Sequence, residues 1–426
     1  MRLYTLLLRL LLPFALARLW WRSRKHPRYA PRWGERLGYG SPLAAGSLWI
    51  HAVSVGEVRA AAPLIRALLD AHPDIPLLVT TTTLTGAAQV DMLFGQSVQH
   101  RFAPFDLPSA LRRFLERTRP HAAVILETEL WPNLFQALRR ADIPLVLANV
   151  RLSERSYRRY RRFRGLTAHM LAVPTAIAVQ SSADAGRIRA LGAPAQRVHV
   201  TGNMKFEMTP TASLREAAQA LRYEWGERPV WVAASTHQGE EEIVLDVHVR
   251  LRAIFPSLLL ILVPRHPERF EAVAKLGRQR GLTLVERSLG LPVTVDTAVF
   301  LGDTMGELVL FFAAADCAFI GGSLVETGGH NPLEALALGV PTVFGPHMFN
   351  FDEIGKLTRE AGAGVQVRDT VSLAEAIGRY LGDQEARLAA GRAGEELVLA
   401  HQGACAQTLG LLEPFVRRPL SPSAGP

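Results

Sequence analysis

The first candidate for chemistry is Glu57, in the segment HAVSVGE at residues 51–57. An apolar run at residues 48–53 leads into a turn at Gly56, so the segment predicts a strand, a turn and the start of a helix. The helix dipole and free N–H groups of a first turn favour an ionised carboxylate, which could act as a general base. Capping of the helix alone explains Glu57 equally well.

Two further glutamates and a lysine follow other predicted strands. Glu127 and Glu129 occur in ETELWPN at residues 127–133, directly after the apolar run 122–126. Their spacing places both side chains on one side if the strand continues, so they could bind a cation, orient a hydroxyl or be partly structural. Lys205, in GNMKF after residues 198–201, would stabilise a carboxylate or a departing phosphate, unless it is simply solvated.

The second half of the chain places polar or glycine-rich segments after its predicted strands. These are STHQGEEE at residues 235–242, PRHP at 264–267, GDTMGE at 302–307 and GGSLVETGGHNPLE at 321–334. Arg265 offers a guanidinium fork for phosphate. Asn331 and Pro332 predict a helix cap and first position, with Glu334 in the first turn, where an acid can accept hydrogen bonds from ribose hydroxyls.

Several other chemistries are disfavoured. The sequence has no G-x-x-x-x-G-K-[ST] phosphate loop, no G-x-S-x-G elbow, no paired Cys and His at metal-ligand spacing and no D-x-D triplet. We therefore expect a transferase with no metal or other cofactor. Two cysteines, Cys317 and Cys405, exclude a disulfide-dense scaffold, and the apolar run around Cys317 predicts a buried thiol.

Short β-branched runs alternate with helical patterns such as residues 58–71 and 107–117, which predicts an α/β fold with parallel sheets. The predicted strands are residues 48–53, 77–83, 122–126, 145–150, 176–180 and 198–201, then 230–234, 258–263, 298–301, 318–320 and 341–344. Two doubly wound sheets in sequence would place a ligand in the crevice between the carboxyl ends of their strands. We expect an anchor at residues 1–25 and domains at 26–210 and 211–426.

Residues 3–21, LYTLLLRLLLPFALARLWW, are about long enough to cross a bilayer and end in a Trp pair. Arg9, Pro13 and Arg18 make a simple span costly, so a tilted span and a helix lying in the interface both remain open. A cleaved signal peptide is the alternative. Six basic residues between Arg22 and Arg36 favour an uncleaved anchor with a cytoplasmic body.

The formal net charge of +9 is unevenly distributed. Residues 1–40 hold 9 Lys and Arg against one acid, whereas residues 41–426 hold 39 against 38. Up to Lys205 the counts are 29 and 12, and beyond it 19 and 27. This gradient favours an anionic membrane and a phosphorylated acceptor on the basic side over nucleic acid.

Taken together, HAVSVGE, ETELWPN, GNMKF, PRHP, GDTMGE and GGHNPLE, in this order behind an apolar N-terminus, closely resemble the bacterial Kdo transferases. These enzymes attach 3-deoxy-D-manno-octulosonic acid (Kdo) to lipid A precursors. The resemblance covers essentially the whole chain. It implies a GT-B fold of two Rossmann-like domains, the first binding mainly the acceptor and the second mainly CMP-Kdo.

The resemblance also implies roles for single residues. Glu57 would be the catalytic base, and Glu127 and Lys205 would assist the transition state. Contacts to CMP are implied for Pro264, Arg265, Met305, Gly306, Glu307, Asn331, Pro332, Leu333 and Glu334. The expected reaction is an inverting, metal-independent transfer of Kdo from CMP-Kdo to lipid IVA in lipopolysaccharide biosynthesis, at the cytoplasmic face of the inner membrane.

Two alternatives remain. One is another membrane-associated GT-B transferase that uses a different nucleotide sugar. The other is a nucleic-acid-binding protein that uses residues 151–164, which hold seven arginines and one acid. Tyr157, Tyr160 and Phe163 in that stretch predict an amphipathic helix, so its arginines would face lipid, the acceptor's phosphates or solvent.

Overall fold

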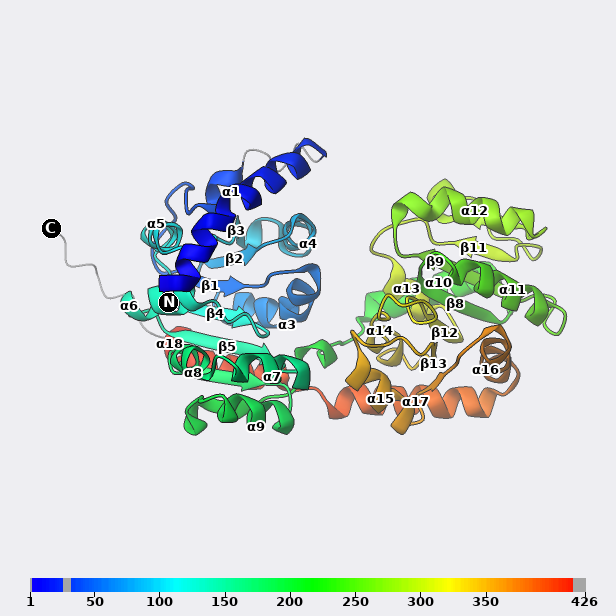
Figure 1. The fold of residues 1–426 in the computed structure, drawn as a ribbon. Helices are drawn as coiled ribbons and strands as arrows, with labels where there is room; N and C mark the ends of the chain where they lie inside the picture. Colours follow the sequence, from blue (N-terminus) through cyan, green and yellow to red (C-terminus); the bar gives the residue numbers. More distant parts are fainter. Residues whose placement is uncertain (1, 26–31, 417–426) are drawn as a thin grey trace. The chain divides into compact units, whose positions relative to one another are not determined.

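The computed structural model describes residues 2–25 and 32–416 and divides the chain into two compact units (Figure 1). Unit 1 comprises the residues up to Glu207 together with the segment from Gln402 onward, and unit 2 comprises Met208–His401. In the described residues each unit contains a seven-stranded sheet whose strand pairs are parallel. The predicted α/β class with two doubly wound sheets is confirmed.

The sheet of unit 1 has the strand order β3-β2-β1-β4-β5-β6-β7. Its strands are β1 Leu48–His51, β2 Leu77–Thr81, β3 Gln99–Phe102, β4 Ala122–Leu126, β5 Leu145–Val150, β6 Ala176–Val179 and β7 Val198–Val200. The central strands are buried over their full length because helices cover both faces. The neighbouring strands β1 and β4 end at the same edge, which is where the chain continues into Glu57 and Glu127.

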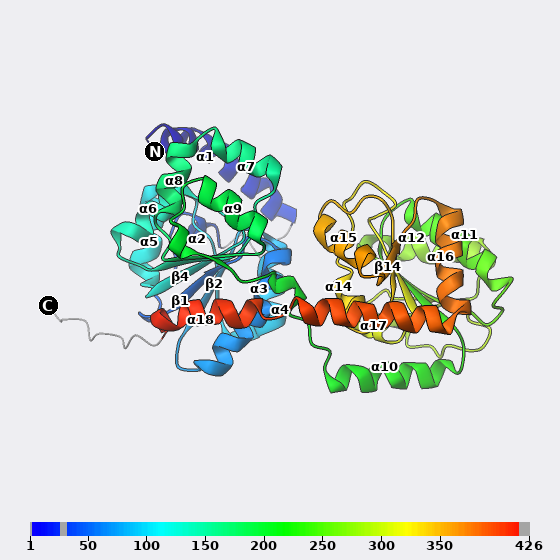
Figure 2. The same cartoon turned by 90° about the horizontal axis from the view of Figure 1, so that it is seen from below.

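The helices of unit 1 come mainly from the connections between its strands. They are α1 Arg2–Lys25, α2 Trp33–Arg36, α3 Val55–Ala71, α4 Leu84–Phe94, α5 Pro108–Thr118, α6 Pro132–Arg140, α7 Glu154–Arg161, α8 Arg164–Leu171, α9 Ser182–Ala190 and α18 Ala404–Val416, with 3-10 turns η2 Gly95–Ser97, η3 Ala195–Arg197 and η4 Met204–Phe206. Figure 2 shows α18 running alongside α3.

The division of the chain differs from the expected domain at 211–426. The boundary near residue 210 lies within three residues of Glu207, but the described residues from Gln402 to Val416 belong to unit 1. The physical reason is apolar packing, since Cys405, Leu412 and Val416 of α18 join the core formed by β1, β2 and α3.

Unit 2 has the strand order β10-β11-β9-β8-β12-β13-β14. Its strands are β8 Val230–Thr236, β9 Leu259–Pro264, β10 Leu284–Glu286, β11 Val299–Leu301, β12 Cys317–Ile320, β13 Thr342–Phe344 and β14 Gly364–Gln366. Its helices are α10 Ala212–Trp225, α11 Glu240–Arg252, α12 Phe270–Gln279, α13 Leu308–Ala313, α14 Leu333–Leu336, α15 Asp352–Glu360, α16 Thr370–Gly382 and α17 Gln384–Ala400, with 3-10 turns η5 Pro267–Arg269 and η6 Arg287–Leu289. Cys317 is fully buried, as predicted.

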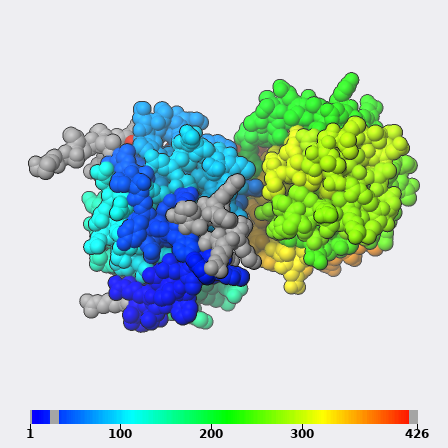
Figure 3. Space-filling view, turned by 90° about the horizontal axis from the view of Figure 1, so that it is seen from above, coloured from blue at the N-terminus to red at the C-terminus, as the bar shows by residue number. Residues whose placement is uncertain are grey.

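Helix α1 lies along the surface of unit 1 rather than projecting from it (Figures 1 and 3). The Tyr4 hydroxyl donates to Asp106 at 2.9 Å and the Thr5 hydroxyl to Asn133 at 3.0 Å, which fastens the start of the helix. One helical stripe is half-buried, at Tyr4, Thr5, Leu8, Leu12, Ala15, Leu16 and Leu19. In the described residues α1 contains the one helical segment that is apolar and long enough to cross a membrane, judged by length and composition.

The predicted helix over residues 151–164 is interrupted. Helix α7 ends at Arg161, and α8 begins at Arg164. Tyr157 and Tyr160 are half-buried against the core of unit 1, whereas Phe163 is 66% exposed. The aromatic residues therefore serve mainly to pack α7 onto the unit. Residues 26–31 of the predicted basic flank lie outside the described residues.

Candidate active site

Glu57 lies in the first turn of α3, whose cap residue is Ser54. Its carboxylate accepts hydrogen bonds from the Val53 backbone N–H at 2.8 Å and from the Ser54 hydroxyl at 3.0 Å. The Ser54 hydroxyl accepts in turn from the Glu57 N–H at 3.5 Å. This arrangement is a close variant of the capping box, so the predicted position and the capping role are both confirmed.

The protonation of Glu57 differs from the expected ionised state. Burial raises the pKa of Glu57 to about 7, and the charges of Glu127 and Glu129 also raise it, against the lowering effect of the hydrogen bonds from Val53 and Ser54. The side chain is nearly inaccessible, with the residue only 7% exposed, so the loss of water outweighs the helix dipole. A carboxyl with this pKa is well matched to accepting a proton near neutral pH.

Glu127 does not continue the strand. Strand β4 ends at Leu126, and Glu127 has a φ of +56°, so the predicted two-residue alternation with Glu129 does not apply. This left-handed conformation is costly for a residue with a side chain, and such conformations cluster at functional sites. The carboxylate of Glu127 forms an ion pair with the Lys205 ammonium at 3.6 Å.

Lys205 reaches Glu127 because the chain turns back after β7, the strand at the far edge of the sheet. The short helix η4 lies beside α3, and the Asn149 side chain of β5 accepts a hydrogen bond from the Met204 N–H at 3.0 Å. Asn149 is fully buried with a φ of +56°, beside an irregularity in the pairing of β5 and β6. The sequence did not indicate this role, because an asparagine inside an apolar strand gives no sign of its partner.

Glu129 is held by aromatic residues of the same unit. Its carboxylate accepts a hydrogen bond from the Trp131 indole N–H at 2.7 Å. The Trp131 ring meets the edge of the buried His51 ring, with centroids 4.9 Å apart. Burial raises the pKa of Glu129, and the charge of Glu127 adds to this effect. Helix α6 begins at Pro132, directly after this tryptophan.

The residues expected to contact CMP all lie in unit 2, at the ends of β9, β11 and β12. Pro264 ends β9, and the half-buried Arg265 follows with its backbone N–H donating to Thr236. Met305 is 65% exposed, and Gly306 adopts a φ of +93° that favours glycine. No finding tests their contact with a nucleotide, so their role stays a prediction.

Glu307 is engaged within its own unit. The Arg287 guanidinium donates to its carboxylate at 2.9 Å, and the Thr304 hydroxyl donates as well. The hydrogen bond from Arg287 lowers the pKa of Glu307. The sequence did not indicate Arg287 as the partner of Glu307, because the strand β11 separates the two residues along the chain.

The last predicted group follows β12. The Asn331 side chain accepts a hydrogen bond from the Leu333 N–H at 3.2 Å, as expected of a cap. Helix α14 begins at Leu333, so Pro332 precedes the helix instead of occupying its first position. Glu334 lies in the first turn, as predicted.

The amides of the glycine-rich loop have an unexpected partner. The carboxylate of Glu240, in the first turn of α11 and fully buried, accepts hydrogen bonds from the N–H groups of Gly322, Ser323 and Leu324 at 2.6–3.0 Å. It also accepts from the His237 N–H at 2.9 Å. These amides of the glycine-rich loop are thus occupied by a protein carboxylate.

Residues 31–208 match the family model described as 3-Deoxy-D-manno-octulosonic-acid transferase (kdotransferase), and residues 280–397 match glycosyl transferases group 1. The 3-deoxy-D-manno-octulosonic acid transferase of Haemophilus influenzae is 42% identical over 421 residues, which cover 97% of this chain and 98% of that protein. The chain belongs to the Kdo transferase family. Its activity is accordingly that of a glycosyltransferase that transfers Kdo.

One solved structure resembles part of the enzyme, and another resembles most of it. The match to the C-terminal CMP-Kdo binding domain of WaaA from Acinetobacter baumannii covers 44% of this chain and 99% of that domain, at 34% identity and a TM-score of 0.43. UDP-GlcNAc 2-epimerase from Neisseria meningitidis covers 87% of this chain and all of its own, at 14% identity and a TM-score of 0.60. The second likeness concerns the fold alone and agrees with two Rossmann-like units.

Proposed function

We propose that the enzyme transfers Kdo from CMP-Kdo to a hydroxyl of a lipid A precursor, lipid IVA, with Glu57 as the general base. The observation that carries this proposal is the environment of Glu57, whose pKa is raised to about 7 by burial and by Glu127 and Glu129. Such a group accepts the acceptor's proton as the oxygen attacks the anomeric carbon. One base on the acceptor side fits a single displacement, which inverts the anomeric centre.

Glu127 and Lys205 act together in this proposal. Their ion pair places an ammonium group within reach of the carboxylates around Glu57. A cation there limits the accumulation of negative charge as Glu57 ionises and as charge develops in the transition state. Substituting Lys205 alone would leave three carboxylates facing one another.

The motifs of unit 2 support the identity of the donor. The motifs shared with Kdo transferases, together with the CMP-Kdo named for the WaaA domain, support CMP-Kdo as the nucleotide sugar. Its leaving group is a monophosphate, for which the Arg265 guanidinium and helix N-termini supply stabilisation, so we propose transfer without a metal. In the described residues no group of three or more Cys, His, Asp or Glu has the geometry of a metal site.

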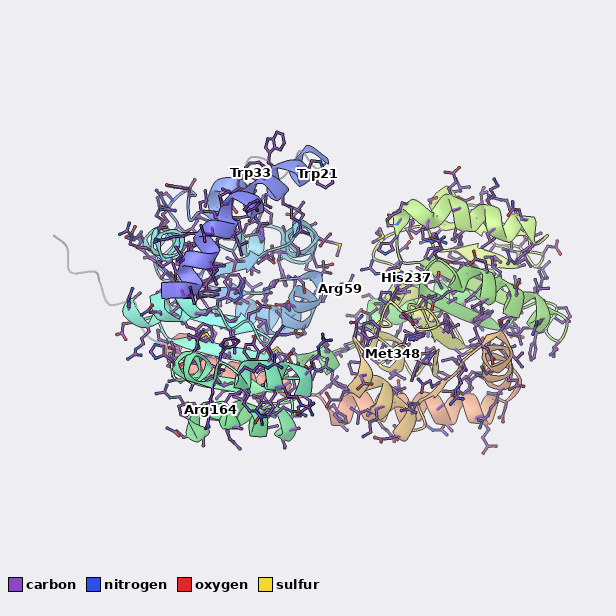
Figure 4. All side chains as sticks on the ribbon, in the orientation of Figure 1. Trp21, Trp33, Arg59, Arg164, His237 and Met348 are labelled. Atoms are coloured by element: carbon purple, nitrogen blue, oxygen red, sulfur yellow. The ribbon has the colours of Figure 1, made fainter. Side chains whose placement is uncertain are left out.

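The membrane location is part of the same proposal. The outward side of α1 carries exposed apolar side chains, which are Leu3, Leu6, Leu7, Leu10, Leu11, Phe14, Trp20 and Trp21. Trp21, in the last part of this helix, is labelled in Figure 4. An apolar face with a terminal Trp pair suits attachment at the cytoplasmic face of the inner membrane, where a lipid acceptor is found.

The test is to incubate the enzyme with CMP-Kdo and tetra-acylated lipid A precursor, then read product masses and the anomeric configuration. Glu57→Gln is expected to lower transfer by at least about a hundredfold, in the range of lost general-base catalysis, with CMP binding unchanged. Addition of EDTA is expected to leave the rate unchanged. Transfer by Glu57→Gln at the wild-type rate would refute the base, and inhibition by UDP but not CMP would refute the donor.

A further inference from the structure

Three histidines that the proposed mechanism does not use lie together in unit 2. His237 follows β8, His266 follows β9, and His330 lies in the glycine-rich loop after β12. The Nε2 atoms of His237 and His330 are 2.9 Å apart, and their rings stack with centroids 5.1 Å apart and planes inclined by 8°. The ring of His266 stands edge-on to His237, with centroids 5.4 Å apart. Figure 4 labels His237.

This geometry fixes how the two facing Nε2 atoms are protonated. Two imidazole nitrogens at hydrogen-bond distance share one proton, because one must donate and the other accept. Burial lowers the pKa of His330 to about 3, and the charges of Arg265, His237 and His266 lower it further. Burial also lowers the pKa of His237, with His266, Arg265 and Arg269 contributing. Both effects oppose a second proton on either ring, and a nearby negative charge would favour one.

Of the three glutamates in the first turn of α11, Glu240 and Glu241 are bonded to other groups, whereas one buried oxygen of Glu242 has no hydrogen-bond partner among the described residues. Glu240 is surrounded by backbone N–H groups, including that of His237. Glu241 is paired with Arg269 by two hydrogen bonds at 3.1 and 3.2 Å. Glu268, 77% exposed, lies 4.0 Å from the Nδ1 of His266. Arg265 and the neighbouring imidazoles lower the pKa of both His237 and His330, so a bound anion would favour an added proton on the pair.

Three backbone N–H groups of the glycine-rich loop are already used and do not bind the anion. Glu240 already accepts from the N–H groups of Gly322, Ser323 and Leu324. Gly322, with a φ of +67°, supports the His330 ring closely, since a Cβ there would lie 3.1 Å from the ring's Cδ2. The backbone of the loop therefore positions an imidazole instead of binding the anion directly.

We propose that His237 and His330, together with His266 and Arg265, form a proton-linked site for an anionic group of the donor. The group is either the phosphate of the CMP moiety or the carboxylate of Kdo, and the inference rests on CMP-Kdo as the proposed donor. When the anion binds, the histidine pair takes up a proton from solvent and presents two N–H donors to the anionic oxygens. Release of the anion returns the proton to solvent.

The experiment measures dissociation constants of the full-length enzyme for CMP, free Kdo and cytidine between pH 7 and 9. In this range the CMP phosphate is already a dianion, because its second pKa is about 6. Uptake of one proton weakens binding by about tenfold per pH unit. We expect this dependence for CMP if the phosphate occupies the site and for Kdo if the carboxylate does, and we expect none for cytidine.

His237→Gln and His330→Gln are expected to flatten the pH dependence, with the variants' melting temperatures as a check of folding. His72→Gln, a half-buried histidine after α3 in unit 1, is the matched control and should keep the wild-type slope. A wild-type slope of zero for both CMP and Kdo would overturn the inference, and this measurement needs no variant. A slope that persists in both folded variants would overturn it as well. If neither CMP nor Kdo binds while another nucleotide sugar is used, the proposed donor fails and the inference falls with it.

Discussion

The carboxylate of Glu57 caps α3 and at the same time has a pKa near neutrality. The sequence left capping and catalysis as alternatives, but the structure shows that capping does not preclude a raised pKa. Two hydrogen bonds hold the carboxylate in place, and burial with two neighbouring carboxylates opposes its ionisation. The sequence could not predict the balance, because the exposure of Glu57 depends on packing by residues distant in the chain.

Removing a neighbouring negative charge should move the pH profile of transfer. Glu57 must be ionised to accept a proton, so the rate is expected to rise with pH through about 7. Glu129→Gln removes a charge that raises this pKa, so the acidic limb should move to lower pH by roughly half to one unit. Glu116→Gln, at an exposed surface pair, is the control and should leave the limb in place. An unchanged or higher midpoint in Glu129→Gln would show that Glu129 does not act on the base.

The raised pKa also predicts a stability effect. The pKa of about 7 in the folded state exceeds the ordinary value of 4.5. The contribution of Glu57 to the free energy of unfolding is therefore greatest below pH 4.5 and is lost as the pH rises through 7. At pH 8.5 this cost reaches at most about 3 kcal/mol. Glu57→Gln should therefore raise the melting temperature at pH 8.5 while abolishing most activity. At pH 5 the same substitution should raise the melting temperature less or not at all. An equal change at both pH values would contradict a buried charge as the cause.

Among the elements, burial decides which strands the sequence could predict. Strands such as β4 and β5, buried over every residue, were predicted to the residue. The three that were missed, β3, β10 and β14, are edge strands of their sheets. Strand β3 reads QHRF, and the other two have three residues each, so none offers the apolar run that marks an interior strand. Similarly, the glycine-rich loop was located correctly, but its partner Glu240 is about 80 residues earlier in the chain.

Helix α1 gives a prediction at this scale. Its inward stripe packs on unit 1, and its outward side exposes large apolar residues such as Leu10 and Phe14, at 62% and 74%. Each such side chain contributes about 1.5–3 kcal/mol when it leaves water. Leu10→Asn with Phe14→Asn should therefore weaken flotation with anionic vesicles at least tenfold. Leu399→Asn, an equally exposed leucine of α17, should have no effect. Unchanged flotation of the double variant would refute lipid contact through this face.

For the whole molecule, the charge gradient follows the division into units. The basic excess ends near Lys205, two residues before the boundary at Glu207, and the acidic remainder belongs mostly to unit 2. In this acidic unit the proposed anion site depends on local groups, namely Arg265 and the histidines, and not on net charge. Composition thus located the basic excess in unit 1, but it could not indicate where the donor's anionic group would bind.

The return of the chain to unit 1 makes the C-terminal segment part of the stability of that unit. From the sequence we expected this segment in the domain at 211–426, because the apolar residues of α18 do not show which unit they pack against. Leu412 is fully buried in the core with β1 and α3. Its replacement by alanine should lower the free energy of unfolding by about 2–5 kcal/mol. Leu412→Ala should therefore lower the unfolding temperature of unit 1, while CMP binding by unit 2 persists at temperatures where transfer is lost. Leu399→Ala, 65% exposed on α17, should change neither. Parallel loss of CMP binding and transfer in Leu412→Ala would show that the two units unfold as one.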